Sequence, residues 1–203
     1  IEFIDPHSLM SLAPAKVKKA EMKNEREILL TLDRNIPQNI REIKELVVEN
    51  VTYTPEVLIR GNYFARIPTR GILVSTRRKV LIENNTFFRM QMSGILIADD
   101  ARSWFESGMA RDVTIRNNNF IECGGPVILI APENDRNEGY VHRNIAITNN
   151  RFQLTGADAV SAKSVDGLKI TDNLFLTPKA FTLEDLIKTR ECKDVTIDGN
   201  IIQ

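Results

Sequence analysis

One short segment recurs six times along this chain of 203 residues, and its spacing constrains the fold more than any other feature. The copies read VLIRGNYF, VLIENNTF, VTIRNNNF, IAITNNRF, LKITDNLF and VTIDGNII. Their shared asparagines are Asn62, Asn85, Asn118, Asn150, Asn173 and Asn200, at intervals of 23, 33, 32, 23 and 27 residues. Two residues after each asparagine stands Phe64, Phe87, Phe120, Phe152, Phe175 or Ile202. Such a period indicates one structural unit stacked many times.

The repeat predicts an all-β fold, a right-handed, single-stranded parallel β-helix. Each copy holds a strand with alternating inward and outward residues, and it buries its apolar face only when another coil stacks on it. Stacking places equivalent residues about 4.8 Å apart. We therefore expect the asparagines to form an amide ladder and the phenylalanines an offset column. Leucine-rich repeats are the rival architecture, but their consensus leucines and short period are absent.

A second strand recurs in the same coils. Its copies are RGILVSTRR (70–78), SGILIADDA (93–101), GPVILIAPEN (125–134) and ADAVSAKSV (157–165). The predicted coil is therefore a strand, a turn, a second strand and a return. The two longest intervals place extra residues at 101–111 and 133–143, after the same strand. Loops inserted at one phase of a solenoid collect on one face, which is commonly the binding face.

Residues 1–48 do not fit the repeat, and residues 49–203 form the predicted coils. AKVKKAEMK, EREILLTLDR and IREIKELVVEN predict short strands of an accessory module, part of a small β-barrel or sandwich. A helix through 14–28 is the competing interpretation, because of its Ala, Lys and Glu content. The chain opens on Ile1 within a strand-like sequence, so we expect the first half of this module and the natural N-terminus upstream.

Composition narrows the partners. Lys+Arg and Asp+Glu both number 27, so the chain has no excess of positive charge with which to bind a phosphate backbone. No apolar run approaches the roughly 18 residues that a membrane-spanning helix needs. We expect neither nucleic acid nor membrane as a partner. Cys123 and Cys192 fall in different coils and predict free buried thiols, because no disulfide framework or zinc spacing exists. His7 and His142 stand alone, so we assign them no role in a metal site or triad.

Stacking the second strands gathers polar side chains at one strand edge. The alignment gives one column of Thr76, Asp99, Pro132 and Lys163 and a second of Arg77, Asp100, Glu133 and Ser164. Paired carboxylates suit glycoside hydrolysis, because one gives a proton to the leaving oxygen and the other activates water or attacks the anomeric carbon. Crowding of like charges raises one pKa of such a pair. The competing interpretation of Asp99-Asp100 is a turn or a calcium-binding rim.

Five further residues are candidates for substrate binding: Trp104, Glu106, Arg77, Lys163 and Glu122. Trp104 offers a flat face to a sugar ring, or it anchors its loop to the helix wall. Glu106 is an acid candidate if the same loop folds over the site, and is otherwise solvated. Arg77 and Lys163 bind hydroxyls or an anionic substituent, or form ion pairs. Glu122 reaches the site or caps the tight turn that follows it.

With these residues in view, the chain resembles glycoside hydrolase family 110, the exo-acting α-1,3-galactosidases of gut and marine bacteria. The motifs that carry the resemblance are YTPEVLIRGNYF (53–64), RGILVSTRRKVLIENNTF (70–87), GILIADDARSWFESGMARDVTIRNNNF (94–120) and GGPVILIAPEN (124–134). FIDPHSLMSL (3–12) and ILLTLDRNIP (28–37) are similar to strands of the family's accessory β-barrel. The match therefore spans nearly the whole chain.

The resemblance implies hydrolysis of terminal α-1,3-linked galactose with inversion and without a metal or cofactor, by a secreted or periplasmic bacterial protein. Asp99 and Asp100 match the family's aspartate pair. Inversion requires the two catalytic carboxyls to lie about 6.5–9.5 Å apart, with room for water between them. If the adjacent aspartates act together as the base and its helper, the acid is Glu133 or Glu122 on another coil. Family members are longer, so this chain alone is expected to lack activity if a needed residue lies upstream. An uncapped first coil also predicts a homodimer.

Two rival functions stay open at this point. The first is another carbohydrate-active β-helix enzyme. Polygalacturonases share an Asp-Asp pair, but their Gly-His-Gly and Arg-Ile-Lys signatures are absent. Polysaccharide lyases use a calcium-bound acidic cluster with a basic residue, for which Lys163 and Arg77 are available. The second rival is a non-catalytic glycan-binding β-helix, against which the insertions beside the acids count.

Overall fold

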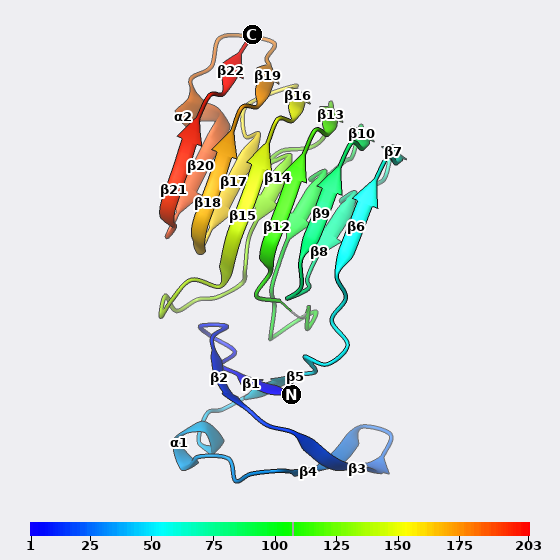
Figure 1. The fold of residues 1–203 in the computed structure, drawn as a ribbon, viewed down its shortest axis with the longest axis vertical. Helices are drawn as coiled ribbons and strands as arrows, with labels where there is room; N and C mark the ends of the chain where they lie inside the picture. The colour runs from blue at the N-terminus through cyan, green and yellow to red at the C-terminus, as the bar shows by residue number, and fades with distance from the viewer. Residues whose placement is uncertain (107) are drawn as a thin grey trace.

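The structure, a computed structural model, describes residues 1–106 and 108–203. Its larger part is a stack of coils in which three parallel sheets run along the stack (Figure 1). The first sheet contains β6 (Val57–Arg60), β9 (Val80–Glu83), β12 (Arg111–Arg116), β15 (His142–Thr148), β18 (Val165–Thr171) and β21 (Lys193–Asp198). The second contains β7 (Tyr63–Ala65), β10 (Thr86–Phe88), β13 (Asn119–Ile121), β16 (Arg151–Gln153), β19 (Leu174–Leu176) and β22 (Ile201–Ile202). The third contains β8 (Ile72–Val74), β11 (Ile95–Ile97), β14 (Ile128–Ile130), β17 (Val160–Lys163) and β20 (Ile187–Arg190).

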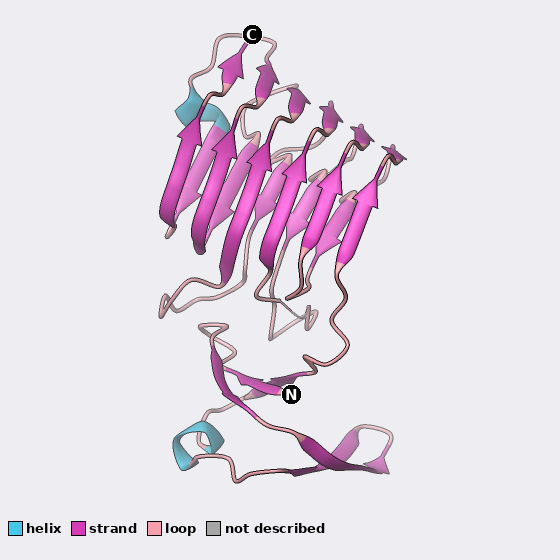
Figure 2. Ribbon diagram, in the orientation of Figure 1, coloured by secondary structure: helices cyan, strands magenta, loops and turns pink. Residues whose placement is uncertain are grey.

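Each strand pairs with the equivalent strands of the coils before and after it, so the predicted parallel β-helix is confirmed. Figure 2 shows that strands dominate the described chain, with the one-turn helix α2 (Leu183–Leu186) between β19 and β20. The third sheet holds the predicted second strand of each coil. In its middle strands the inward residues are fully buried, as Ile95 and Ile97 illustrate, each at 0% exposure.

The coil differs from the prediction at the asparagine turn, which separates two strands instead of ending one. The residue before each ladder asparagine has a left-handed φ between 54° and 68°. These residues are Gly61, Asn84, Asn117, Asn149, Asp172 and Gly199. Gly, Asn and Asp are the types that adopt this conformation most readily. The backbone then returns to the extended form, so a complete coil has three strands where the sequence predicted two.

The asparagine ladder and the phenylalanine column are both confirmed. In each coil the asparagine donates its backbone N–H and its Nδ2 to the Oδ1 of the next ladder asparagine, at 2.9–3.1 Å from Asn62 to Asn200. The rings from Phe64 to Phe175 stack with centroids 4.8–5.0 Å apart and planes 11–26° from parallel. Both columns lie inside the helix, and the ladder bonds are buried in the middle coils and partly buried at Asn62 and Asn200.

The N-terminal module is a small set of strands below the coils in Figure 1. Its elements are β1 (Glu2–Ile4), β2 (Ser11–Pro14), β3 (Val17–Asn24), β4 (Glu27–Leu32), α1 (Gln38–Arg41) and β5 (Val47–Glu49). β1 pairs antiparallel with both β2 and β5, and β3 and β4 form a hairpin where the sequence predicted two strands. The hairpin also rules out a helix through 14–28. The strand predicted over 40–50 is partly wrong, because Pro37 precedes a helical turn and only Val47–Glu49 is a strand.

The module docks on the two inserted loops, which follow β11 and β14. A buried apolar cluster joins them, made of Ile4, Leu9, Ala101, Met109 and Val141. The insertions therefore hold the module beside the C-terminal ends of β11 and β14. Cys123 and Cys192 are free thiols, as predicted, but only Cys123 is buried and Cys192 is partly exposed. No helix within the described ranges is long and apolar enough to span a bilayer.

Candidate active site

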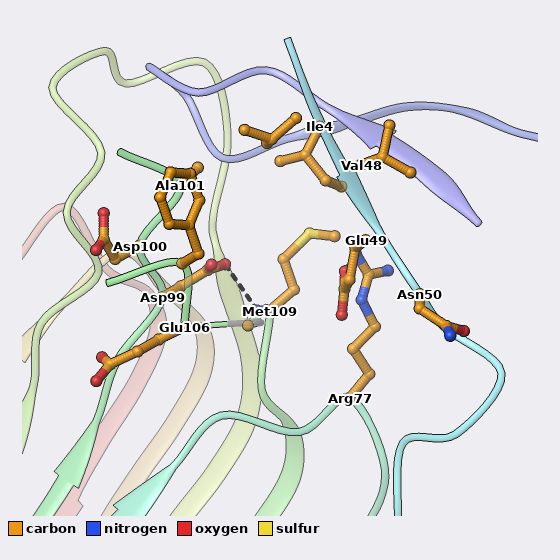
Figure 3. A pocket seen from close by; sticks show the side chains of 13 residues that line it. Ile4, Val48, Glu49, Asn50, Arg77, Asp99, Asp100, Ala101, Glu106 and Met109 are labelled. Atoms are coloured by element: carbon orange, nitrogen blue, oxygen red, sulfur yellow. Dashed lines mark hydrogen bonds and ion pairs between the residues drawn. The ribbon is translucent and has the colours of Figure 1, made fainter. Parts of the chain in front are cut away.

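A pocket of about 280 Å³ lies between the N-terminal module and the loop after β11. Four residues that the sequence singled out line it: Arg77, Asp99, Asp100 and Glu106. The other lining residues are Ile4, Val47, Val48, Glu49, Asn50, Ala101, Phe105, Gly108 and Met109. Figure 3 shows acidic side chains from both bodies around this space. The insertion after β11 thus builds one wall and strand β5 of the module builds the other.

Asp99 and Asp100 are both buried, with 6% and 3% of their surfaces exposed, and they differ in their hydrogen-bond donors. The Oδ2 of Asp99 accepts a hydrogen bond from the Met109 N–H at 2.8 Å (Figure 3). Burial raises the pKa of Asp99 to about 7, and the negative charges of Glu49 and Asp100 also raise it. The Met109 N–H and the positive charge of Arg77 act in the opposite direction. Asp99 therefore carries a proton through much of the neutral pH range.

Gly108 allows Asp99 to occupy this position. A Cβ on residue 108 would lie 1.9 Å from the Cγ of Asp99, far inside van der Waals contact. The missing side chain is therefore the space in which the Asp99 carboxyl sits. Gly108 is therefore needed to make room for the Asp99 side chain, and not only for the conformation of the loop.

Asp100 faces the opposite environment, although it is the next residue. Its carboxylate accepts the backbone N–H of Arg102 at 2.8 Å, the Ser103 N–H at 3.1 Å and the Ser103 hydroxyl at 2.6 Å, and it also accepts the Trp104 N–H. Burial alone would raise the pKa of Asp100, but these donors lower it to about 2. Asp100 is thus ionised at neutral pH and closes the turn that begins the loop.

Arg77 connects the coils to the module. Its Nη1 lies 2.6 Å from the Oε2 of Glu2, and its Nη2 forms an ion pair with Glu49. The guanidinium is only 11% exposed, so these carboxylates neutralise a charge that burial would otherwise make costly. Glu49 brings a further carboxylate into the pocket beside Asp99.

The loop over the pocket carries the other two candidates. Glu106 lines the pocket, accepts the Asp100 N–H on its carbonyl at 3.1 Å, and places its carboxylate 3.5 Å from Nη2 of Arg70. Trp104 is 80% exposed, so the interpretation in which its ring anchors the loop to the helix wall is wrong. Phe105, the next residue, lines the pocket, whereas Trp104 is not among its lining residues, so a substrate-binding role for Trp104 stays a prediction.

The remaining three candidates lie elsewhere. Lys163 was assigned to the column of Asp99, but Ile130 pairs with Ala162, so the alignment was one residue out and Lys163 lies beside Ala131. Its ammonium donates to the carbonyls of Pro132 and Asn134, at 3.3 and 2.6 Å. Burial lowers the pKa of this ammonium.

Glu133 and Glu122 are also outside the described lining of the pocket. Glu133 does follow Asp100 one coil on, since its N–H donates to the Asp99 carbonyl at 2.9 Å, but its side chain is exposed. Glu122 lies after β13, at the opposite end of the coil (Figure 1), where it pairs with Arg89 at 2.6 Å. Any catalytic or binding role for these two stays a prediction.

Three residues near the pocket were missed by the sequence analysis: Glu49, Gly108 and His142. Glu49 lies at the boundary between module and coils, where no repeat fixes the register. Gly108 stands inside an insertion without regular structure. His142 has no partner by spacing, because its contact is with a backbone N–H of the neighbouring coil. The roles of these three residues become visible only once the loops and coils are placed in space.

Among the residues that the structure describes, no group of three or more His, Cys, Asp or Glu side chains is placed to hold a metal ion. The family model for a right-handed β-helix region matches residues 50–175. The chain belongs to the right-handed β-helix family. A second family model, for the GLAA-B β-barrel domain II, matches residues 1–43 of this β-helix protein.

Curated relatives of this β-helix chain carry one printed name in two forms. Alpha-1,3-galactosidase A of Bacteroides thetaiotaomicron is 49% identical over 100% of the chain and 36% of the relative. Alpha-1,3-galactosidase A of Akkermansia muciniphila is 43% identical over 86% of the chain and 29% of the relative. Alpha-1,3-galactosidase B of Bacteroides thetaiotaomicron is 36% identical over 100% of the chain and 35% of the relative. The chain thus spans about a third of the length of these relatives, and the resemblance to α-1,3-galactosidases is confirmed.

Proposed function

We propose that this chain forms part of a glycoside hydrolase that releases terminal α-1,3-linked galactose from glycans, with inversion and without a metal or cofactor. The observation that carries the proposal is the contrast between two adjacent aspartates on one pocket. Both side chains are buried, but the Asp99 carboxyl accepts a single N–H donor, whereas the Asp100 carboxylate accepts four donors. Surroundings that separate the pKa values of two carboxyls supply an acid and an ionised partner at the same pH.

Asp99 is the proton donor in this scheme. It gives its proton to the glycosidic oxygen as the bond between that oxygen and the anomeric carbon breaks. The proton is available because burial holds the pKa of Asp99 at about 7. The donated proton leaves with the rest of the glycan as its new hydroxyl group.

Asp100 is the base in the same scheme. Water attacks the anomeric carbon from the face opposite the leaving group and passes a proton toward the Asp100 carboxylate, so an α-galactoside yields β-galactose. Glu49 and Glu106 line the same pocket and are the alternative holders of this role. Glu133 keeps its place as a more distant candidate, one coil from Asp100.

Substrate contacts are proposed for the exposed loop after β11 and for the lining of the pocket. The exposed ring of Trp104 is suited to stack on the apolar face of a sugar, and Arg77 and Glu106 offer hydrogen bonds to hydroxyls. Lys163 and Glu122 lie outside the described pocket lining, so binding through them requires a glycan that extends beyond it. We also propose a secreted or periplasmic protein, because glycans that end in galactose are extracellular polymers. A homodimer is proposed as its assembly.

The test uses the natural full-length protein that contains this chain. Proton NMR of the first galactose released from an α-1,3-galactosyl disaccharide should show the β anomer. Asp99→Asn should lower kcat/KM for the disaccharide by roughly 10²–10⁴-fold. The loss should be much smaller for a nitrophenyl α-galactoside, whose leaving group needs little protonation. Asp194→Asn is the matched control, because Asp194 is 72% exposed in β21, far from the pocket.

Azide separates the candidates for the base. Asp100→Ala should be inactive and should regain turnover with azide, giving β-galactosyl azide. If Glu49→Ala is rescued instead, the base is Glu49. Full activity of Asp99→Asn on the disaccharide, or α-galactose as the first product, would contradict the proposal.

A further inference from the structure

Behind the pocket lies a histidine that the proposed mechanism does not use. His142, the first residue of β15, is 0% exposed. Its Nδ1 accepts the backbone N–H of Ala110 at 3.1 Å, and the next N–H along the strand, from Arg143, donates to the Ala110 carbonyl at 3.1 Å. The peptide groups on both sides of Ala110 are thereby tied to the neighbouring coil.

The residue before Ala110 is the one that contacts Asp99. Met109 donates its N–H to Asp99 Oδ2 at 2.8 Å, and it does so with a left-handed φ of 52°. A residue with a side chain adopts this conformation at a cost of roughly 1–2 kcal/mol, so the surroundings must hold it there. The Met109 side chain packs against Ile4 and Leu9 of the module, which fixes the side chain but not the peptide plane.

We infer that His142 is a positioning residue, which holds the Met109–Ala110 peptide so that the Met109 N–H stays directed at the Asp99 carboxyl. The expected effect of His142 on catalysis rests on the proposed function. Its expected effect on the pKa of Asp99 rests on the hydrogen bonds alone. The remaining charged groups at Asp99 are Glu49 from β5, Arg77 after β8, and Asp100 and Glu106 from its own loop.

The protonation of the imidazole fits this role. Burial alone lowers the pKa of His142 to about 3, so the ring is neutral. An Nδ1 that accepts a hydrogen bond carries no proton, which leaves the ring proton on Nε2. Nε2 is buried and has no hydrogen-bond partner among the described residues. An unsatisfied buried N–H is costly, so its presence requires a benefit elsewhere, and the bond to Ala110 is that benefit.

Two variants separate positioning from simple packing. His142→Leu keeps bulk and removes the acceptor, whereas His142→Asn is smaller and keeps an acceptor, its Oδ1, where Nδ1 stood. In His142→Leu the carbon-13 titration midpoint of the Asp99 carboxyl should rise by roughly one pH unit, because the charged form loses its N–H donor. The kcat for the disaccharide should fall at least tenfold with KM little changed. His142→Asn should restore both values most of the way.

The wild-type protein provides a test that does not depend on folding of a variant. Nitrogen-15 NMR should detect coupling across the hydrogen bond from the Ala110 amide to His142 Nδ1. The Met109 amide proton should shift with the same midpoint as Asp99. Absence of that coupling, or an Asp99 midpoint equal in the Leu variant and wild type, would overturn the inference. If Asp99→Asn keeps full activity while the Asp99 midpoint still rises in His142→Leu, the proposed function fails and the positioning role stands.

Discussion

The interior of the coils and the edge where the module docks are built on different principles. Inside the helix, one asparagine and one phenylalanine recur in register, and each makes the same contacts as its copy in the next coil. At the docking edge the contacts of one coil are not repeated in the next. Asp99 accepts the Met109 N–H beside Gly108, whereas Asp100 accepts donors from its own loop.

This difference shows what repetition can and cannot supply. A repeated column stabilises many coils with one sequence pattern, but it gives equivalent residues equivalent environments. A reaction that needs one protonated and one ionised carboxyl requires unequal environments for similar groups. The insertions after β11 and β14 create that inequality by breaking the repeat and by recruiting the module as a second wall.

The largest expected effect comes from breaking the phenylalanine column. Phe120 is 1% exposed and stacks on both Phe87 and Phe152. Phe120→Ala should therefore lower the free energy of unfolding by about 3–5 kcal/mol, measured by denaturant titration. Phe105→Ala, a matched deletion at the exposed loop, should cost much less. Equal losses would contradict the division between column and edge.

The second prediction concerns pH and Asp99. An unfolded aspartate ionises near pH 4, whereas folded Asp99 ionises near 7, so the folded chain binds the extra proton between these values. Stability contributed by Asp99 therefore falls as pH rises from about 4 to about 7, by up to roughly 4 kcal/mol. Below pH 4 the contribution is fully present. Thermal unfolding of wild type and Asp99→Asn across this range should show the fall only in wild type.

The third prediction compares an asparagine in the middle of the ladder with the asparagine at its C-terminal end. Asn118 is 2% exposed, accepts from Asn85 and donates to Asn150. Asn118→Ala leaves those partners buried and unsatisfied, at a cost of about 1–3 kcal/mol. Asn200→Ala, in the last coil described, should cost less because its surroundings are more exposed. A larger loss at Asn200 than at Asn118 would show that burial does not set the strength of the ladder.

The smallest expected effect on stability is at Trp104, in the exposed loop after β11. Trp104 is 80% exposed, so Trp104→Ala should change the free energy of unfolding by less than about 0.5 kcal/mol. Its effect should appear in binding, as a rise in KM for the disaccharide with kcat retained. Unchanged KM would remove Trp104 from the substrate site.

The repeat made the ladder and the column predictable, because one segment that recurs six times fixes both together. It did not reveal that the asparagine turn separates two strands, so the third strand of the coil was missed. The edge was predictable only where it continues the strands, and Asp99 and Asp100 follow β11 directly. Lys163 was misplaced because its coil is aligned by a single short strand, in which a shift of one residue is easily made. Glu49 and His142 were missed because their contacts join separate parts of the chain. No periodic pattern encodes such contacts.

The most direct test of the account is the ionisation of the two neighbouring aspartates. Carbon-13 NMR can follow the carboxyl resonances of Asp99 and Asp100 across the pH range in one sample. The structure predicts midpoints at about 7 for Asp99 and about 2 for Asp100. Two midpoints near the ordinary value of about 4 would contradict it, because the acid and its ionised partner would then be indistinguishable.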